Sequence, residues 1–283
     1  MRPGGGLWHD HRSPAALAAR CFDEHARPHP HPAQDAQRRP MSVPQPRVRE
    51  VRTGRVRTLA RPGVRSAIDK QPVDGPIAVG ALGLAGDEQG DLAIHGGPDK
   101  AVHLYAWAHY AAWRAELPGC AVLQRPGAFG ENLSVDGLIE ADVCIGDRWR
   151  VGSTLLEVSQ GRQPCWKLNL RFGVADMAAR VQDSLRAGWY CRVVEAGTLA
   201  TGDALQLLSR PHPAWPIARL LALIKDRACA PRELAEVLEL PLTASWRRLF
   251  GRRLEHGAVE DWTRRMQSAE HPVGDDATRD ARR

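Results

Sequence analysis

Short apolar runs punctuated by glycine occupy residues 47–210, and this pattern restricts that part of the chain to strand-rich folds. The runs of strand length cover Ile77–Asp87, Val143–Trp149, Val151–Val158, Trp189–Val194 and Leu205–Leu208. Helical spacing interrupts them twice, at Tyr105–Leu117 and Asp176–Leu185. We therefore predict a mostly β domain with inserted helices, closed into a largely antiparallel barrel. No GxGxxG or P-loop motif occurs, which disfavours a nucleotide-binding α/β fold.

The character of the sequence changes at Pro211, after which apolar residues keep helical spacing. We predict three short helices, beginning near Ile217 and covering Pro231–Glu239 and Thr243–Glu255, in a small domain over residues 211–266. Residues 267–283 are a polar tail. Residues 1–46 are rich in Pro, Arg, His and Ala without a periodic apolar segment, so we expect a disordered extension, or translation from Met41.

Composition narrows the class of protein. The formal net charge is +6 over 283 residues, which a basic pocket for a phosphorylated ligand explains as well as nucleic acid does. The six cysteines are scattered without a CxxC pair, which favours reduced thiols and a cytoplasmic protein over zinc ribbons or a disulfide framework. No apolar run reaches transmembrane length, so no membrane partner is expected.

One cysteine lies in a setting that suits chemistry. Cys165 follows Pro164 in the turn after the predicted strand Val151–Val158, and the cations Arg162 and Lys167 flank it. Nearby positive charge favours the thiolate, which attacks electrophiles and binds soft metals. A buried structural cysteine is the alternative, because free cysteine is among the most buried residue types.

A second candidate feature is the turn that contains Gly96 and Gly97, with Lys100 three residues later. Consecutive glycines expose backbone N–H groups that bind anions, and a lysine adds charge, so the turn is a candidate phosphate site. An ordinary glycine turn remains the alternative. Asn132 could bind a ligand or only its own loop.

Together these pieces resemble the MOSC domain family, and within it the YiiM-like proteins. The matching segments are Ser66–Val73, Gly83–Gln89, His95–Val102, Phe129–Leu133 and Ser159–Leu168, and the C-terminal helices resemble the three-helix domain of that subfamily. The segments occur in consistent order over roughly residues 47–266. One departure is Leu104–Trp107, where relatives often have a Tyr-Pro pair.

The resemblance implies a MOSC-type β-barrel that binds the molybdenum cofactor (molybdopterin) and reduces N-hydroxylated compounds, such as N-hydroxylated purine bases, to amines. It implies that Cys165 is the catalytic residue and the thiolate ligand of molybdenum. The implied cofactor contacts are Ser66, Lys70, His95, Gly96, Gly97, Lys100, Asn132, Ser159, Arg162 and Lys167. Because the chain lacks the clustered cysteines of a ferredoxin-like domain, electrons are expected from a separate flavoprotein or ferredoxin-type partner.

Other functions stay open from the sequence. The chain could be a non-catalytic carrier of the cofactor, or a sulfur carrier or cysteine nucleophile without metal. A helix-turn-helix regulator would place Arg247, Arg248, Arg252 and Arg253 against DNA phosphates, although charges on the solvated face of a helix are commoner and nucleic acid is not the expected partner. A homodimer, a role in detoxification and a pyridoxal phosphate assignment also stay open.

Overall fold

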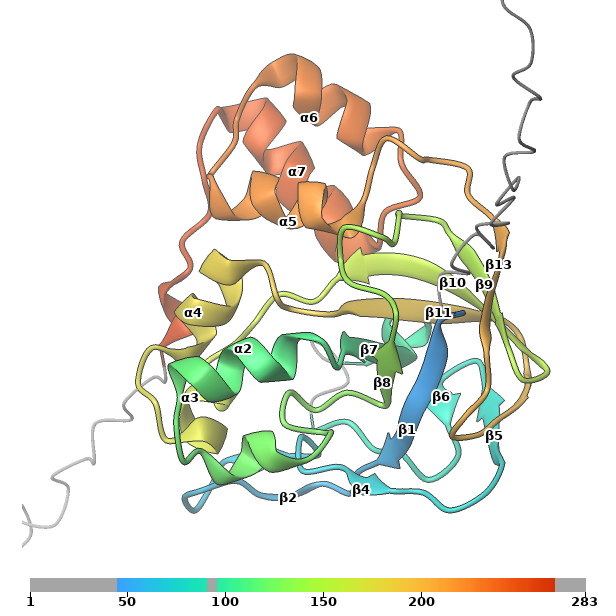
Figure 1. Ribbon diagram of the computed structural model, residues 1–283. Coiled ribbons are helices and arrows are strands. Elements are labelled where there is room, and N and C mark those ends of the chain that lie inside the picture. The colour runs from blue at the N-terminus through green and yellow to red at the C-terminus, as the bar shows by residue number, and fades with distance from the viewer. Residues whose placement is uncertain (1–44, 91–95, 268–283) are drawn as a thin grey trace, which may run out of the picture. The chain divides into compact units, whose positions relative to one another are not determined.

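The computed structural model in Figure 1 describes residues 45–90 and 96–267. Its largest element is an eight-stranded sheet with the order β13-β9-β10-β11-β7-β8-β1-β4. These strands are β1 (Arg47–Thr53), β4 (Gln71–Pro72), β7 (Val102–Ala106), β8 (Leu133–Asp136), β9 (Arg148–Val151), β10 (Thr154–Gly161), β11 (Trp189–Glu195) and β13 (Leu205–Ser209). Among the strands of the described residues, only β7 and β8 pair in parallel. The prediction of a mostly antiparallel, sheet-rich domain is confirmed.

Two small sheets complete the strands. Strand β5 (Ile77–Gly80) pairs with β6 (Gly83–Leu84) and with β12 (Gly197–Leu199), so the predicted single strand over residues 77–87 is a hairpin. Strand β2 (Arg57–Thr58) pairs with β3 (Arg65–Ser66).

Closure of the large sheet into a barrel stays a prediction. In the described residues the strand order ends at β13 and β4, which are not paired with each other. The start of β1 does approach the chain just before β13, because Val48 N donates to Asp203 O at 2.8 Å and Leu205 N donates to Pro46 O at 2.8 Å. An isolated bridge between Arg47 and Ala204 joins them, but no continuous ladder forms there.

Helices follow the sheet or are inserted between its strands. They are α2 (His109–Glu116), α3 (Lys167–Phe172), α4 (Met177–Ser184), α5 (Ile217–Lys225), α6 (Pro231–Leu238), α7 (Ala244–His256) and α8 (Thr263–Met266), with 3₁₀ turns η1 (Pro98–Lys100) and η2 (Ala121–Gln124). Thr243 caps the start of α7, because its hydroxyl accepts the N–H of Trp246, and Gly257 follows the helix in the left-handed region with φ 60°. The predicted C-terminal helical region is therefore present. None of the helices in the described ranges is long and apolar enough to cross a membrane.

Two further sequence predictions were wrong about local structure. The helix predicted over Tyr105–Leu117 begins only at His109, because Tyr105 belongs to β7 and is fully buried. The strand predicted over Val143–Trp149 begins only at Arg148. Residues 143–147 instead form a turn in which the Asp147 carboxylate accepts the N–H of Cys144 at 2.9 Å. A side chain that satisfies a backbone donor competes with strand pairing.

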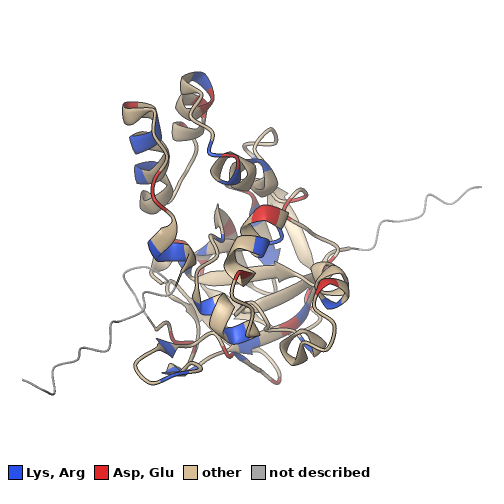
Figure 2. Ribbon diagram, turned by 90° about the vertical axis from the view of Figure 1, so that its left-hand side faces the viewer, with Lys and Arg blue, Asp and Glu red and all other residues tan. Residues whose placement is uncertain are grey.

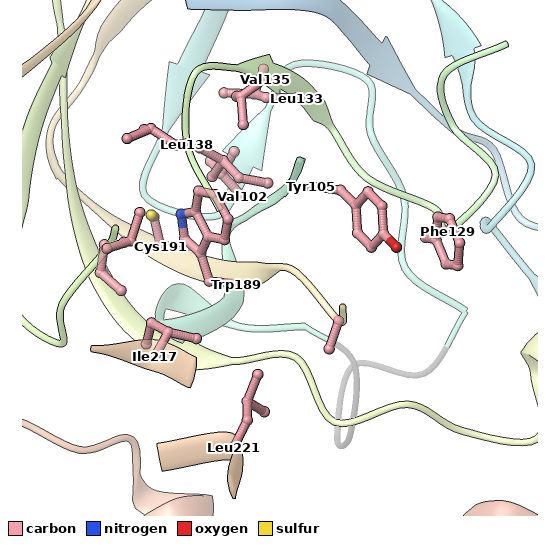
Figure 3. Close-up of a cluster of buried hydrophobic side chains, with 14 of the residues drawn as sticks. Val102, Tyr105, Phe129, Leu133, Val135, Leu138, Trp189, Cys191, Ile217 and Leu221 are labelled. Carbon is pink, nitrogen blue, oxygen red and sulfur yellow. The ribbon is translucent and has the colours of Figure 1, made fainter. Parts of the chain in front are cut away.

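One apolar cluster extends from the large sheet to the C-terminal helices (Figure 3). It includes Val102 of β7, Trp189 of β11 and, from α5, Ile217 and Leu221. Because α5 packs directly on the strands, the helical region shares its core with the sheet that carries the cysteine turn.

Candidate functional site

The cysteine turn, residues 159–168, leaves the end of β10 and enters α3. Ser159 at the end of β10 and Leu168 at the start of α3 are both fully buried, so both ends of the turn are anchored in the core. Between them Cys165 is a free thiol of intermediate exposure. This cysteine is therefore neither a fully buried structural residue nor part of a disulfide.

The C-terminal helices hold this turn from one side. The hydroxyl of Thr243, at the start of α7, donates to Gln160 Oε1 at 2.7 Å. Trp246 Nε1 donates to Gln163 Oε1 at 3.1 Å. Two glutamines of the turn are thus fixed by one helix that lies some eighty residues further along the chain.

Ser159 joins the cysteine turn to the predicted phosphate turn. Its hydroxyl lies within hydrogen-bond distance of the carbonyl oxygens of Asp99, at 2.5 Å, and of Tyr190, at 3.0 Å. Asp99 belongs to η1, which follows Gly97 at φ 90°, a conformation that favours glycine. Ser159 therefore joins the cysteine turn to the η1 turn that follows Gly97.

Lys100 at the end of η1 is partly buried. Burial lowers its pKa; the carboxylate of Asp99 opposes this shift, and the cation Arg248 of α7 reinforces it. The η1 turn thus carries a partly desolvated lysine with a second cation from the C-terminal helices in its surroundings. An anion would be stabilised in such an environment.

Arg162 is 6% exposed, and its Nη1 atom has no hydrogen-bond partner among the described residues. Its backbone N–H is used, donating to Gly188 O at 2.9 Å. Burial raises the pKa of Tyr190, with Arg162 opposing and Cys165 reinforcing the shift, which places both residues near the tyrosine hydroxyl. A buried guanidinium with an unused donor beside a half-exposed thiol is a strong sign of a ligand site.

His103 of β7 lies near Arg162 and Tyr190, and the sequence analysis did not predict it as a site residue. It is 4% exposed, its ring lies 4.9 Å from that of Tyr190, and its Nε2 atom also lacks a partner among residues 45–90 and 96–267. Burial lowers the pKa of His103 to about 3, and the charge of Arg162 acts in the same direction. The imidazole is therefore neutral at physiological pH. In the sequence it is a single histidine within an apolar run, which carries no functional signal.

Lys70 and Asn132 form a separate network with Asp87. The Lys70 ammonium contacts Asp87 Oδ1, and Asn132 Nδ2 donates to Asp87 Oδ2 at 2.9 Å. The side-chain oxygen of Asn132, Oδ1, also accepts the backbone N–H of His103 at 3.1 Å. This bond connects the network to His103, which lies near Arg162. Burial lowers the pKa of Lys70, although Asp87 opposes the shift. Both predicted contacts are thus engaged within the protein and reach the site through His103.

The remaining predicted cofactor contacts, Lys167 and Ser66, form hydrogen bonds with the segment 65–68. Lys167 Nζ donates to the carbonyl of Arg65 at 3.0 Å, next to Ser66, whose hydroxyl accepts the N–H of Ile68 at 3.2 Å. His95 lies outside the described residues. The structure therefore groups Ser159, Arg162, Cys165 and the η1 turn most closely.

The C-terminal arginines considered as phosphate contacts are partly committed elsewhere. Arg253 is 1% exposed and pairs with Glu260 at 2.8 Å, while Arg247 donates to the carbonyl of Leu238 at 2.7 Å. Figure 2 shows basic and acidic positions interspersed along the chain. Helix α7 itself carries four arginines and one glutamate, so the case against a DNA contact is that Arg247 and Arg253 are bound within the protein.

Known proteins resemble both the sheet region and the C-terminal helices of this chain. Residues 91–206 match the MOSC domain and residues 215–257 match the YiiM-like 3-alpha helix domain. The chain is 38% identical to Protein YiiM from Escherichia coli, over 77% of this chain and 96% of that protein. A crystal structure of E. coli YiiM aligns with a TM-score of 0.67 at 33% identity, covering 78% of this chain and 99% of the other.

A protein designated "Reductase" from Gibberella moniliformis is 42% identical over 69% of this chain, and the match covers only 35% of that longer protein. The crystal structure of YiiM from Geobacillus stearothermophilus aligns with a TM-score of 0.63 at 32% identity, over 74% of this chain and 99% of the other. With both domain matches in order and a relative matched over nearly its full length, this chain belongs to the MOSC domain family, in its YiiM-like branch.

Proposed function

We propose that this protein is a molybdenum cofactor-dependent reductase that converts N-hydroxylated compounds, such as N-hydroxylated purine bases, to the corresponding amines. The observation that carries the proposal is the half-exposed thiol of Cys165 beside Arg162, whose buried Nη1 atom lacks a partner in the described part of the chain. Family membership and the relative designated a reductase support the same activity class.

The donor set fits the cofactor. Cys165 offers one soft thiolate ligand, the kind that molybdenum takes. No group of three or more His, Cys, Asp or Glu in the described ranges could hold a metal ion by itself. A metal at Cys165 would therefore have to bring further ligands with it, as a metal bound to the pterin dithiolene does. Arg162 and the η1 turn with Lys100 offer donors and charge for the anionic part of the pterin.

When bound, the cofactor supplies two-electron chemistry, in which an N–OH group, two electrons and two protons give N–H and water. The protein residues position it: Cys165 would ligate the metal, Arg162 would donate to the pterin from its unused Nη1, and Lys100 would neutralise the phosphate. His103 is neutral because burial lowers its pKa to about 3. It can therefore offer a hydrogen bond to the cofactor without repelling the neighbouring cation Arg162. Electrons would come from a separate flavoprotein or ferredoxin-type donor.

The test compares Cys165→Ser with Cys120→Ser, a control at another half-exposed free cysteine. Full-length protein is made in a molybdenum-replete host, its metal and pterin contents are measured, and turnover of an N-hydroxylated purine is followed with an artificial electron donor. We expect wild type and Cys120→Ser to turn over, and Cys165→Ser to lose turnover at matched pterin occupancy while staying folded.

Each other outcome points to a different function. Wild type that holds pterin and metal but turns over no substrate would be a cofactor carrier. If wild-type protein contains no metal, the remaining hypotheses are a cysteine nucleophile or a sulfur carrier. Full turnover by Cys165→Ser would remove the cysteine as the metal ligand.

A further inference from the structure

The segment after α7, residues 260–267, returns to the cysteine turn and contacts it on both sides of Cys165. Arg265 Nη1 donates to the carbonyl oxygen of Pro164 at 2.8 Å. The N–H of Trp166 donates to the carbonyl oxygen of Arg265, also at 2.8 Å. The residues immediately before and after Cys165 are therefore bound to a single arginine.

Further contacts fix the position of that arginine. Its Nη2 atom donates to Gln182 Oε1 of α4 at 2.7 Å. Asn169 Nδ2 of α3 donates to the carbonyl of Met266 at 3.1 Å. Burial lowers the pKa of Arg265 to about 10, which still leaves it a cation at physiological pH. The guanidinium thus links α4 to the cysteine turn, and the backbone of the next residue, Met266, binds α3.

The other end of the segment is bound to the C-terminal helices. Glu260 pairs with the buried Arg253 of α7 at 2.8 Å and accepts the indole N–H of Trp262 at 2.8 Å. The Trp262 ring has Arg227 4.4 Å from its centroid and Arg265 5.6 Å from it. Because both ends are held, the segment connects the helical region to the turn with little freedom.

We propose that Arg265 is a positioning residue for Cys165: through Pro164 and Trp166 it holds the turn in the one arrangement that presents the thiol for ligation. Its guanidinium binds two acceptors at a fixed angle, which a side chain with a single donor atom cannot reproduce. The identification of the ligand as a metal rests on the proposed function, whereas the constraint on the thiol does not.

The first experiment needs no activity. Full-length cofactor-free protein is treated with iodoacetamide at one pH, and alkylation of Cys165 is followed by peptide mass spectrometry, with Cys120 as the internal reference. Loss of the contact opens the turn more often, so Arg265→Ala should react roughly tenfold faster. Arg265→Lys should be intermediate, because lysine can reach one acceptor. Arg264→Ala, a change at the neighbouring exposed arginine, should react like wild type.

Gln182→Ala distinguishes the effect of the bond from Arg265 to Pro164 from the effect of the bond from Arg265 to α4. It removes the bond to Nη2 and leaves the bond between Nη1 and Pro164, so its effect should be clearly smaller than that of Arg265→Ala. An equal effect would overturn the proposal, because anchoring to α4 alone would then explain the rate. A wild-type alkylation rate for Arg265→Ala would overturn it too.

The second experiment uses the cofactor-loaded enzyme. A misplaced ligand should lower kcat by about 10²-fold with KM nearly unchanged, and Arg265→Lys should recover part of the loss. An Arg265→Ala enzyme with wild-type kcat per loaded molecule would contradict the positioning role. If wild type carries no cofactor, the proposed reductase function fails, and the alkylation rates still decide the role of Arg265. If Arg265→Ala does not fold, Arg265→Lys takes its place: alkylation faster than in both wild type and Arg264→Ala supports the proposal, and an unchanged rate overturns it.

Discussion

Gly161 lies so close to α5 that a Cβ atom at this position would fall 2.8 Å from Leu221 Cδ2 and 2.9 Å from Leu221 Cγ. Leu221 belongs to the shared core and is 5% exposed, so it has little space in which to move. The chain can therefore leave β10 beside α5 only because residue 161 has no side chain.

This relationship predicts that Gly161→Ala destabilises the protein by about 1–3 kcal/mol through overpacking. The control is Gly251→Ala in α7, where an added Cβ would meet nothing within 4 Å. There the change should be neutral or stabilise by up to about 1 kcal/mol, since alanine is the better helix former. Urea denaturation of both variants measures the difference. Equal effects of the two changes would contradict the close approach of α5.

Acid should destabilise the protein through His103. Its pKa is about 3 in the folded protein and 6.5 for an ordinary histidine. Below about pH 6.5 the unfolded chain therefore binds a proton that the folded chain does not, and the free energy of unfolding falls as pH is lowered toward 3. The slope contributed by this group approaches about 1.4 kcal/mol per pH unit.

The measurement for His103 is urea denaturation between pH 7 and pH 4. His103→Gln removes the titrating group, so its stability should fall less steeply over this range than that of wild type. Identical slopes for the two proteins would show that His103 does not stay neutral when folded.

Lys70→Met should unfold the protein more readily, because it leaves the Asp87 carboxylate buried without its cation. Asp87 is 2% exposed in its side chain and also holds Asn132 and the N–H of Gly54. Breaking a buried pair typically costs about 3–5 kcal/mol, and Asp87→Asn added to Lys70→Met should recover part of the loss. Thermal and urea unfolding test this. A Lys70→Met protein as stable as wild type would mean that the pair contributes little.

Lys100→Ala should instead spare the fold and weaken cofactor retention. The loss of one charge-assisted bond to a phosphate corresponds to roughly 1.5–3 kcal/mol. Pterin occupancy after extended dialysis measures the effect, with Lys225→Ala of α5 as a control for charge alone. Unchanged occupancy in Lys100→Ala would remove the η1 turn from the proposed site.

The sequence predicted the strands and C-terminal helices well wherever local periodicity determines the structure. Helices α4 and α6 and strand β11 begin within a residue of the predicted positions. The errors arose where burial in the sheet or a side-chain bond to the backbone overrides the apolar pattern. Tyr105 belongs to a buried strand although its aromatic neighbours have helical spacing, and Asp147 turns the chain before Arg148 by bonding the backbone of Cys144.

The candidate site was predictable only in part, for the same reason. Cys165 and Arg162 stand near each other in the sequence beside a proline, and local chemistry singled them out. His103 gave no local signal, because its functional setting depends on burial beside Arg162 and Tyr190. Arg265 gave none either, since 101 residues separate it from Pro164.

That separation also sets an order of events during synthesis. The cysteine turn leaves the ribosome long before Gln163 can meet Trp246 and Pro164 can meet Arg265. Domains generally begin to fold from the N-terminal side while the chain is still growing. The nascent sheet therefore passes through a stage in which Cys165 is present but unsupported. Under the proposed function, the cofactor is therefore expected to bind only after α7 and Arg265 have reached the cysteine turn.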